Sequence, residues 1–575
     1  MNTLQGDKYL WLLPNEDKQF VLETAKNYSL SFPICQTLFS RGILTKEQIN
    51  AFLFSSYERD VAHPSLMKDM TKSVDRVIAA INNKEKILVC GDYDVDGITS
   101  SAMMMLCLTP LGAQANFFLP HRVKDGYGLS VDVVERAARN GYKVIITVDN
   151  GITAFEPAKK AKELGIDLII TDHHRPHDHV PDAYAIVDPN QEDCPYEFKY
   201  LAGVGVSFKF LSLLYEKKGE KLPAKVYELL LLGTIADVVP LTGENRFWVR
   251  HGLNYVNKTE SLSFKCLKQN SKFTKSKITS NDIGFNLTPQ INALGRLQDP
   301  RQGVKFLIGS DESEVESIGK ILFELNQTRR DIERKIFLEI ESEIKSKRIN
   351  LDKENIIFAA SNNWPPGVIG LVASRLVGEF GKPALLFHLT KDGKAKGSCR
   401  SISAFNMFDA LQESKHLLEK FGGHSQAAGL ALSIDNLPAL KSKLEEIIAS
   451  KVSEYDLKKK LSLDAQVQLG DLGGKFVSDL EFLEPFGHQN DKPAFYIKNV
   501  VMVQKPMLMK DAHVKCHIFA DGVIKPVIFF NRPALYEKLL LQAEEPFDLA
   551  AQVTENHWNG KVNIELLGLD VAGLK

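Results

Sequence analysis

The sequence predicts a multi-domain α/β protein that ends in a small β-barrel. Three observations lead to this fold class. β-branched runs alternate with helix-like segments from about residue 84, a long proline-free amphipathic stretch follows them, and the tail is rich in strand-forming runs. The length of 575 residues corresponds to about three to five domains.

Composition narrows the class of protein. Hydrophobic residues make up 44% and charged residues 25%, which is typical of a folded protein and excludes a disordered or collagen-like chain. Lys and Arg total 71 and Asp and Glu total 72, so any site for a polyanion must be local. No secretory signal and no run of 18 apolar residues occurs, so we expect a cytoplasmic protein with no membrane association. The seven cysteines have no CxxC spacing, which argues against a disulfide framework or a thiolate zinc site.

The first 310 residues divide into two parts. Residues 1–70 mix short amphipathic stretches that carry no recognisable chemistry, and we expect a helical lead-in. Residues 71–310 form the expected first α/β domain. Runs such as KILVC, VIITV and LIIT alternate there with helix-like segments, which is the pattern of βαβ units in a parallel sheet.

Residues 311–350 are expected to form one long helix. The segment is dense in Glu, Lys and Arg, lacks proline and repeats apolar residues at steps of three and four. At 1.5 Å per residue such a helix exceeds about 50 Å, which favours a connector between two separately folded bodies. The alternative is a pair of helices broken near Gly319 or Asn326.

The remaining chain predicts two further domains. Residues 351–455 return to strand and helix alternation and indicate a second, smaller α/β domain. Residues 456–575 contain LSLDAQVQL, AFYIKNVVMV, HVKCHIF, PVIFF, LAAQVTE and VNIELLGL, separated by turns that include Asn559-Gly560. Five or six such strands predict a small β-barrel or sandwich.

Acids and histidines follow four apolar runs of the first α/β domain. The four motifs are Gly91-Asp92-Tyr93-Asp94-Val95-Asp96-Gly97, Val148-Asp149-Asn150-Gly151, Thr171-Asp172-His173-His174 and Ile235-Ala236-Asp237. We interpret all four runs as strands whose carboxyl ends meet at the ligand-binding edge of a parallel sheet. Converging carboxylates repel one another unless cations hold them, and oxygen ligands with one or two imidazoles favour Mn²⁺ or Mg²⁺. Two such cations would support hydrolysis of a phosphate ester.

These acids also allow two simpler interpretations. The string DxDxDG begins a calcium-binding EF-hand loop as well, but the bidentate Glu required at the twelfth position is Met103 here. Taken singly, Asp96 could cap a helix and Asp172 could orient a histidine. Four coincident motifs favour a metal site over isolated caps.

In their order along the chain, GDYDVDG, VDNG, DHH and GTIADVVPL resemble the motifs of the DHH phosphoesterase family, named after the triplet Asp172-His173-His174. Three later strings resemble the branch of that family that degrades single-stranded DNA. They are Asn292-Ala293-Leu294-Gly295-Arg296, Gly397-Ser398-Cys399-Arg400-Ser401 and Phe421-Gly422-Gly423-His424. The resemblance covers nearly the whole chain from about residue 70. It implies a DHH-type parallel-sheet domain, a DHH-associated domain and a C-terminal OB-fold.

The resemblance also implies an activity and a ligand set. The activity is a 5′ to 3′ exonuclease that hydrolyses single-stranded DNA to mononucleotides in recombination and repair. By motif position, two divalent cations, Mn²⁺ or Mg²⁺, are held by the metal ligands Asp94, Asp96, Asp149, His173 and Asp237. His174 contacts the scissile phosphate and acts as the acid for the leaving group. Asp92 and Asp172 belong to the same catalytic centre, as ligands or as residues that support ligands.

We expect DNA to be held by a further set of residues. This set is Arg122, Arg296, Arg375, Ser398, Arg400, Ser401, Gly423 and His424. The segment KDGKAKGSCRS carries a net charge of 4 − 1 = +3, and its Gly-Ser-x-Arg-Ser end is interpreted as a phosphate-binding turn. Arg122 is the candidate for the 5′ phosphate. Arg296 and Arg375 are either DNA contacts or partners in structural ion pairs.

The β-rich tail offers aromatic rings for base stacking. These are Phe482, Phe486, Tyr496, Phe519, Phe529 and Trp558, of which one or two are expected to be exposed. Two domains clamped by the long helix would leave a channel that admits one strand and excludes a duplex. We expect a monomer that acts on single-stranded DNA beside a helicase and a single-strand-binding protein.

Three other functions stay open at this point. The first is a phosphodiesterase acting on short oligonucleotides or cyclic dinucleotides, which would have no evident need for the third domain. The second is a pyrophosphatase, which needs only a small closed cationic site. The third is a non-catalytic DNA-binding scaffold, which should have lost metal ligands.

Overall fold

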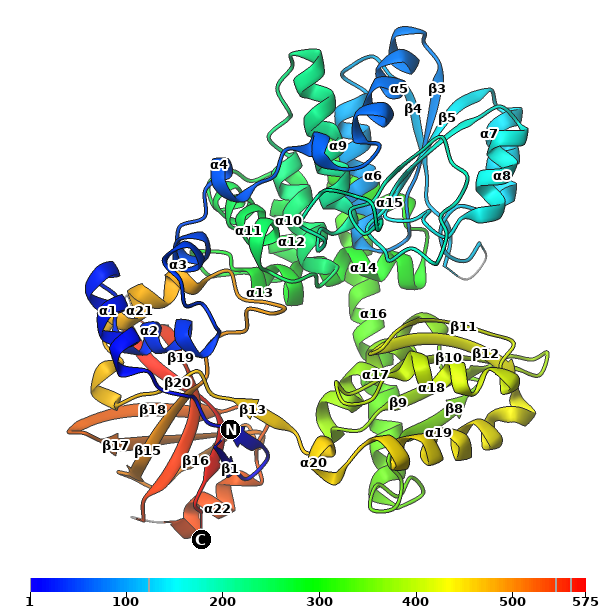
Figure 1. Cartoon of the computed structure of the whole chain (residues 1–575). Coiled ribbons are helices and arrows are strands. Elements are labelled where there is room, and N and C mark those ends of the chain that lie inside the picture. The colour runs from blue at the N-terminus through cyan, green and yellow to red at the C-terminus, as the bar shows by residue number, and fades with distance from the viewer. Residues whose placement is uncertain (1, 123–124, 543–544, 559–560, 575) are drawn as a thin grey trace.

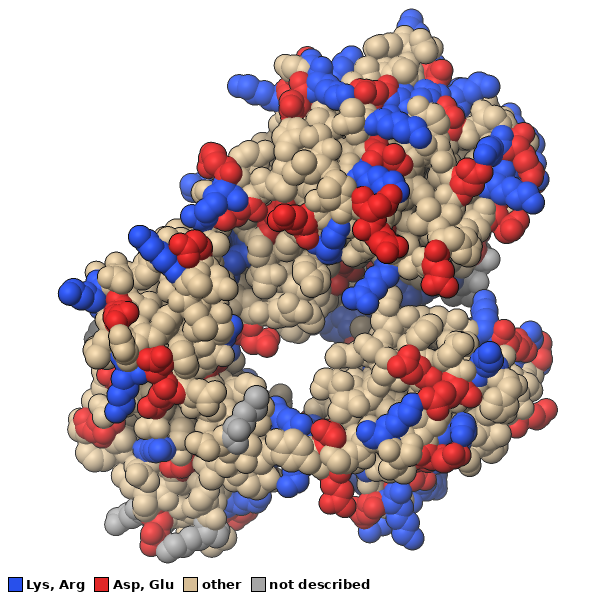
Figure 2. Space-filling view, viewed as in Figure 1, with Lys and Arg blue, Asp and Glu red and all other residues tan. Residues whose placement is uncertain are grey.

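The computed structural model describes residues 2–122, 125–542, 545–558 and 561–574, and the side chains of 556–558 and 561–562 fall outside the description. Figure 1 shows three folded bodies around a central opening, and Figure 2 shows that the opening persists when side chains are drawn. Across the described ranges, every helix is too short or too polar to span a bilayer.

The first body is built on a five-stranded sheet of order β4-β3-β5-β6-β7, in which every pairing is parallel. The strands are β3 (Lys86–Cys90), β4 (Gln114–Phe118), β5 (Tyr142–Val148), β6 (Asp167–Thr171) and β7 (Ala185–Val187). Separate hydrophobic cores cover the two faces of the sheet, which explains why its strands read as continuous apolar runs. The predicted parallel sheet is confirmed.

Helices surround this sheet and extend the body beyond it. They are α5 (Met70–Asn82), α6 (Val95–Leu108), α7 (Val131–Arg139), α8 (Phe155–Glu163), α9 (Gly203–Lys218), α10 (Val226–Ala236), α11 (Gly243–Val256), α12 (Leu262–Asn270), α13 (Ser280–Asp282), the π-helix η2 (Ile283–Leu287), α14 (Thr288–Leu297) and α15 (Arg301–Ile308). The chain runs from β3 to the edge strand β4 and then back to β5 on the other side of β3. The sheet therefore has a topological switch point beside the end of β3, where such folds bind ligands.

One continuous helix, α16 (Glu312–Lys345, 34 residues), joins the first body to the second (Figure 1). At 1.5 Å per residue it is about 51 Å long. Its first half buries Val315 and Leu322 in the first body, and its second half buries Ile336 and Ile340 in the second. The predicted single helix is confirmed, because one amphipathic stripe serves two cores in succession.

The second body has a five-stranded mixed sheet of order β11-β12-β10-β9-β8, in which only β8 and β9 are parallel. Its elements are β8 (Ile357–Ser361), α17 (Pro366–Phe380), β9 (Ala384–Leu389), β10 (Lys394–Arg400), α18 (Met407–Glu413), β11 (Lys420–His424), β12 (Ala427–Ser433) and α19 (Leu437–Lys451). The short helix α20 (Glu454–Leu457) leads from it towards the third body (Figure 1).

The third body contains a closed barrel, because β15 pairs with both β19 and β17 and the pairings β19–β20, β20–β18 and β18–β17 complete the circle. Its elements are β14 (Ala465–Gln466), α21 (Gly474–Leu480), β15 (Phe495–Met502), β16 (Met507–Met509), β17 (His513–Ala520), β18 (Val523–Phe529), α22 (Leu535–Gln542), β19 (Phe547–Trp558) and β20 (Lys561–Ala572). This is the predicted barrel. The expected turn at Asn559-Gly560 lies outside the described residues.

The N-terminal segment joins the barrel instead of standing alone. Strands β1 (Thr3–Gln5) and β2 (Leu10–Leu12) form a small sheet with β13 (Lys460–Ser462). Helices α1 (Lys18–Tyr28), α2 (Phe32–Ser40) and α3 (Lys46–Leu53) pack into the barrel core, and α4 (Tyr57–Asp60) leads back to the first body. The expected lead-in is thus mostly helical, but it begins with two strands, and the second of them, β2, pairs with β13 about 450 residues away.

Candidate metal centre and phosphate-binding site

Three of the four acidic motifs follow strands of the first sheet. Asp92, Asp94 and Asp96 follow β3, Asp149 follows β5, and Asp172 follows β6. Because β3, β5 and β6 are neighbouring parallel strands, these motifs lie at one sheet edge beside the switch point. The predicted convergence of these three motifs is what the structure shows.

The prediction that all four motifs follow strands is wrong for Asp237. This residue ends helix α10, and its carboxylate Oδ2 nevertheless lies 3.6 Å from Nε2 of His173. The preceding run LLLLGTIA is almost wholly apolar, and such a run does not distinguish a buried helix from a buried strand by periodicity. A helix end therefore completes a site that is otherwise made by strand ends.

Backbone amides fix the acids of the first motif. Asp94 caps α6, accepting hydrogen bonds at Oδ1 from the backbone N–H groups of Asp96 and Gly97, both at 3.1 Å. Asp96 accepts from the backbone N–H groups of Gly203 at 2.6 Å and Val204 at 2.8 Å, at the start of α9. The positive end of α9 thus holds a carboxylate that the strand alone would not orient.

Glycine is required at the closest approach between α9 and the sheet edge. A Cβ atom on Gly203 would lie 2.6 Å from the Cβ of Asp149 and 2.8 Å from its Oδ1. Asp149 itself has a φ of +61°, which turns the chain sharply after β5. Gly203 therefore packs directly against an expected metal ligand.

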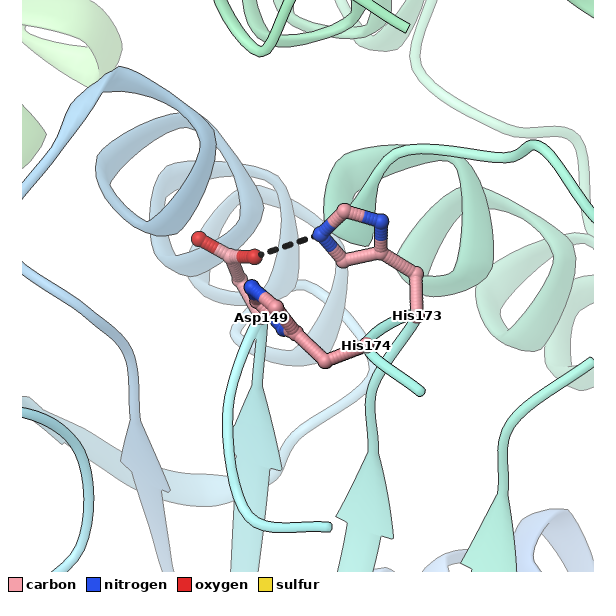
Figure 3. A group of neighbouring side chains, drawn as sticks. All are labelled: Asp149, His173 and His174. Carbon is pink, nitrogen blue, oxygen red and sulfur yellow. Dashed lines mark ion pairs between the residues drawn. The ribbon is translucent and has the colours of Figure 1, made fainter. Parts of the chain in front are cut away.

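The imidazole of His173 is paired with Asp149, as Figure 3 shows, and two further carboxylates lie near it. Its Nε2 is 3.2 Å from Asp149 Oδ1, 3.6 Å from Asp237 Oδ2 and 3.9 Å from Asp96 Oδ2. Three oxygens of mostly buried carboxylates therefore surround one imidazole nitrogen. This arrangement resembles a metal-ligand set more than an isolated salt bridge, because three carboxylates lie around the same ring nitrogen.

Burial and mutual repulsion strain the charges of this group. Burial, and after it the charge of Asp237, raises the pKa of Asp96 to about 7, while burial and the charge of Asp94 raise the pKa of Asp237 to about 8. Burial and the charge of Asp96 hold the pKa of Asp149 well above its usual range, and burial lowers the pKa of His173. These are the shifts expected when like charges share a desolvated site.

The donor set fits divalent cations. Buried atoms Asp92 Oδ1, His173 Nε2 and Asp237 Oδ2 have no hydrogen-bond partner among the described residues. Two groups of side chains each bring their candidate ligand atoms within 4.8 Å of one another. They are Asp92 with Asp94 and Asp149, and Asp96 with His173 and Asp237. A third set joins Asp149 to both histidines. Oxygen-rich sets that adjoin at Asp149 are suited to Mn²⁺ or Mg²⁺.

His174 is held by a carboxylate that is fully occupied. Asp172 Oδ1 accepts from His174 Nδ1 at 2.7 Å and from the backbone N–H of His173 at 2.8 Å, and its Oδ2 accepts from Ile152 N–H at 2.9 Å. Although burial opposes it, the hydrogen bond and charge of Asp172 raise the pKa of His174 to about 9. Burial likewise opposes the charged form of Asp172, but the bond to His174 lowers its pKa to about 2. The pair resembles a cationic imidazole oriented by a carboxylate, with Nε2 left for another partner.

Three guanidinium groups gather beside the acidic group. Arg122 follows β4, Arg296 lies in the last turn of α14 and Arg400 ends β10, so the cluster spans the first two bodies. Burial and the charges of Arg122 and Arg329 lower the pKa of Arg296 to about 10, and burial lowers the pKa of Arg400. None of the three forms an ion pair with a described residue, and Ser398 Oγ accepts from Arg400 at 3.2 Å. Cations that repel one another without a carboxylate partner form a site for an anion.

The other predicted DNA contacts differ in their placement. Burial, and after it the charges of His174, Arg175 and His173, lower the pKa of His424. This residue of the second body therefore lies near the histidines of the first. Arg375 lies 3.9 Å above the Phe337 ring and lines the central cavity. Gly423 has a φ of +136°, which the β11–β12 hairpin itself requires, and the buried Ser401 hydroxyl donates to the Phe405 carbonyl.

The prediction of a turn at Gly397–Ser401 is wrong for residues Gly397–Arg400, which lie in a strand. Residues Lys394–Arg400 form β10, a central strand paired with β9 and β12. Its backbone N–H groups are used by the sheet, so side chains must make any phosphate contact. Glycine and serine at this position suggested a turn, but Gly397 is needed because a Cβ would lie 2.6 Å from the Phe387 ring.

A cavity of about 1780 Å³ lies between the three bodies, where Figure 2 shows the opening. Its basic residues are Arg41, Arg296, Arg329, Arg330, Arg334, Arg375, Lys460 and Lys492, and its acidic residues are Glu333, Asp464 and Asp491. The surplus of basic residues makes the cavity suitable for a polyanion, although the whole chain is nearly neutral.

Most of the aromatic rings named in the β-rich tail are buried or partly buried in the third body. Phe486, Tyr496 and Phe529 are buried, Phe482 is partly buried, and Phe519 is exposed. The side chain of Trp558 lies outside the described residues.

Sequence reasoning missed two residues of the site. Tyr127 donates a hydrogen bond to the Asp149 carbonyl at 3.2 Å, and its ring packs edge-on against His174. Asp188 follows β7, and burial with the charge of Asp172 raises its pKa to about 8. The strand-end rule that found Asp149 would also have found Asp188 after the run AIV, whereas no local pattern points to Tyr127.

Three family models match successive parts of the chain. Residues 86–234 match the DHH family N-terminal domain, residues 353–450 match the DHHA1 domain, and residues 463–570 match the RecJ OB domain. The three matches fall on the three bodies of the structure.

Similar proteins extend these matches to nearly the whole chain. The single-stranded-DNA-specific exonuclease RecJ of Bacillus subtilis (strain 168) is 35% identical over 569 residues, which cover 99% of this chain and 71% of that protein. The corresponding RecJ of Escherichia coli (strain K12) is 33% identical, over 87% of this chain and 89% of that protein. The crystal structure of RecJ in complex with Mn²⁺ from Thermus thermophilus has a TM-score of 0.83 and 25% identity, and covers 98% of this chain and 80% of that one. The chain therefore belongs to the RecJ family of single-stranded-DNA-specific exonucleases.

Proposed function

We propose that this protein is a metal-dependent exonuclease that hydrolyses single-stranded DNA to mononucleotides from the 5′ end, in recombination and repair. One observation carries the proposal. Unpartnered metal-ligand atoms and an unpaired cluster of guanidinium groups lie side by side, next to a cavity of basic character. Phosphodiester hydrolysis needs the first group at the reacting phosphate and the second at a neighbouring phosphate.

The residues that would hold the cations are Asp92, Asp94, Asp96, Asp149, His173 and Asp237. When bound, two divalent cations would supply a nucleophilic hydroxide and stabilise the charge on the leaving oxygen. The protein presets this position through the N-terminus of α9, which holds Asp96, and through Gly203, which lets that helix approach Asp149. In this proposal Asp172 orients His174 and is not a ligand, because described donors occupy both of its oxygens.

His174 would donate a proton to the leaving oxygen of the scissile phosphate. Its hydrogen bond to Asp172 holds the ring in place and keeps it protonated near neutral pH. General acids of this kind contribute about 10²- to 10⁴-fold to rate. His424 of the second body approaches the same point from the opposite domain.

The guanidinium cluster would bind the 5′-terminal phosphate. Arg122, Arg296 and Arg400 with Ser398 provide the anion site, and its position beside the acidic group would place the first phosphodiester bond at the cations. This assignment accounts for the 5′ to 3′ polarity. A strand whose 5′-terminal phosphate lies on the cluster would present its first phosphodiester bond to the cations. The rest of the strand would leave through the central cavity, and its basic residues support the expected channel for a single strand.

We also propose a location, an oligomeric state and protein partners for this enzyme. We infer a cytoplasmic monomer that receives its substrate from a helicase and a single-strand-binding protein. Sedimentation of the purified chain at assay concentration tests the monomer, and co-purification of the two proteins from cells tests the partners.

The function is tested by digesting a single-stranded DNA oligonucleotide labelled at either end, with Mn²⁺, Mg²⁺ or EDTA. Mononucleotide release from the 5′ end is expected with either metal and not with EDTA, and Asp149→Ala and His174→Ala should abolish it. The exposed residue Asp435 offers a matched control, because Asp435→Ala removes a carboxylate far from the centre. Binding without cleavage under every metal would favour a scaffold. Cleavage restricted to very short substrates would favour a small-substrate phosphodiesterase.

A further inference from the structure

Two apolar side chains on the cavity wall are exposed without an evident structural reason. Phe285 is 74% exposed and Val238 is 62% exposed, and both line the central cavity between the three bodies. Large apolar side chains left open to water inside a basic cavity indicate a surface that another molecule covers.

Phe285 is presented by a rigid element. It lies in the π-helix η2, whose neighbouring residues Ile283 and Leu287 are fully buried. Thr288 Oγ1 donates to the Ile283 carbonyl at 3.1 Å, and Ser280 Oγ donates to the Phe486 carbonyl at 2.6 Å, which ties this region to the barrel. Short π-helical segments are frequent at functional sites, and this one points its only large exposed side chain into the cavity.

Val238 is presented by an unusual backbone conformation. Its φ is +59°, a left-handed conformation that β-branched residues rarely adopt. Val238 directly follows the expected metal ligand Asp237, so this turn places an apolar side chain next to the metal centre. A Cβ added to Gly284 would lie 3.3 Å from Ile235 Cγ2, which shows that η2 lies against the end of α10. Val238 and Phe285 therefore share one part of the wall.

A separate part of the wall carries the positive charge. Arg330 and Arg334 of α16 and Arg375 of α17 line the same cavity and are exposed. Arg329, by contrast, is paired with Glu333 at 2.6 Å. The apolar side chains and these guanidinium groups therefore belong to different elements of the cavity wall, the turn after α10 and η2 for the former and α16 and α17 for the latter.

We propose that single-stranded DNA passes through the cavity with its bases on Val238 and Phe285 and its phosphates on the arginines of α16 and α17. The Phe285 ring stacks on one base a short distance to the 3′ side of the scissile bond. This inference rests on the proposed function and deepens it. It names the residue that grips the strand through its bases, which is independent of sequence because every base offers a flat face.

The test combines a protein substitution with a change in the DNA. Phe285→Ala should lower kcat/KM for a single-stranded oligonucleotide by about 5- to 150-fold, the range for one lost stacking contact, and Phe285→Trp should restore it. Hydrolysis of bis(p-nitrophenyl) phosphate, which has no base, should not change. Phe32→Ala, which removes an exposed ring outside the cavity, should have no effect on either substrate.

Oligonucleotides with a single abasic nucleotide at successive positions locate the contact. In the wild type, one position should lower kcat/KM by a similar factor, and at that position Phe285→Ala should cause no further loss. Losses that multiply at every position would overturn the proposal, as would a parallel fall in bis(p-nitrophenyl) phosphate hydrolysis. Failure of the proposed function is distinguishable, because the wild type would then not degrade the unmodified oligonucleotide.

Discussion

Asp570 of β20 provides the sharpest test of how the ring of domains is closed. Its carboxylate is fully buried and accepts hydrogen bonds from Trp11 Nε1 at 2.9 Å, the Tyr9 backbone N–H at 3.0 Å and the Lys8 backbone N–H at 3.1 Å, with Arg532 at 3.4 Å. These contacts hold β1 and β2 on the barrel. Since β2 pairs with β13, which lines the cavity, the carboxylate also positions part of the cavity wall.

Asp570→Ala should weaken this region by about 3–5 kcal/mol, because it leaves three donors, the Trp11 indole N–H and the backbone N–H groups of Lys8 and Tyr9, without their acceptor. Arg532 keeps Asp7 as a partner at 2.7 Å. Hydrogen–deuterium exchange of peptides covering residues 2–13 and 460–463 measures the loss of local stability. The double variant with Trp11→Phe should recover about 1–3 kcal/mol relative to the sum of the single effects, since the indole N–H is then absent. A local stability change below about 1 kcal/mol, or strictly additive effects in the double variant, would refute the reasoning.

Three further predictions concern the catalytic region. Asp237→Asn should raise the Tm of the metal-free protein by about 2–8 °C, because it removes one of several buried carboxylates that repel one another. The same variant should reduce the Tm rise that Mn²⁺ causes. Thermal unfolding in EDTA and in Mn²⁺ measures both effects, and an unchanged Mn²⁺ effect would contradict the assignment of Asp237 as a ligand. Gly203→Ala should lower kcat/KM about 10²-fold, because the added Cβ displaces Asp149. Gly473→Ala should be neutral, because its Cβ would meet open space. Equal activity of the two variants would contradict the close approach of Gly203 to Asp149. Arg400→Lys should lower about tenfold the ratio of kcat/KM for a 5′-phosphorylated oligonucleotide to kcat/KM for a 5′-hydroxyl oligonucleotide, because lysine cannot make a bidentate contact. A ratio equal to that of the wild type would show that Arg400 does not bind the terminal phosphate.

Local sequence patterns were sufficient for the elements that depend on local packing. The continuous apolar runs before Asp92, Asp149 and Asp172 predicted buried parallel strands, and the structure has them as β3, β5 and β6. The regular apolar stripe of residues 312–345 predicted one helix, since each turn buries a side chain in one of the two cores. The same periodicity was uninformative for α10, where nearly every residue is buried and no stripe exists.

The anion site could not be read from the chain in the same way. The sequence points to Arg400 through its local basic segment and to Arg122 as a candidate for the 5′ phosphate, whereas it leaves Arg296 open between a DNA contact and a structural ion pair. No local pattern predicts that the three meet. Tertiary structure brings the three together from a loop, a helix end and a strand end, and none of them forms an ion pair with a carboxylate of the described residues. Phe285 is a similar case, because a lone phenylalanine in a helical segment is more often buried than exposed.

The sequence by itself determined the class of chemistry and the order of the domains. Carboxylates and histidines that follow apolar runs predict a cation site wherever those runs become parallel strands, and this depends on short-range patterns alone. The tertiary structure decided which helix end supplies Asp237, which cations gather beside the metal centre, and which barrel strand receives the N-terminus. These contacts join segments up to 562 residues apart, so their pairing depends on how whole domains pack and not on the neighbours of any one residue.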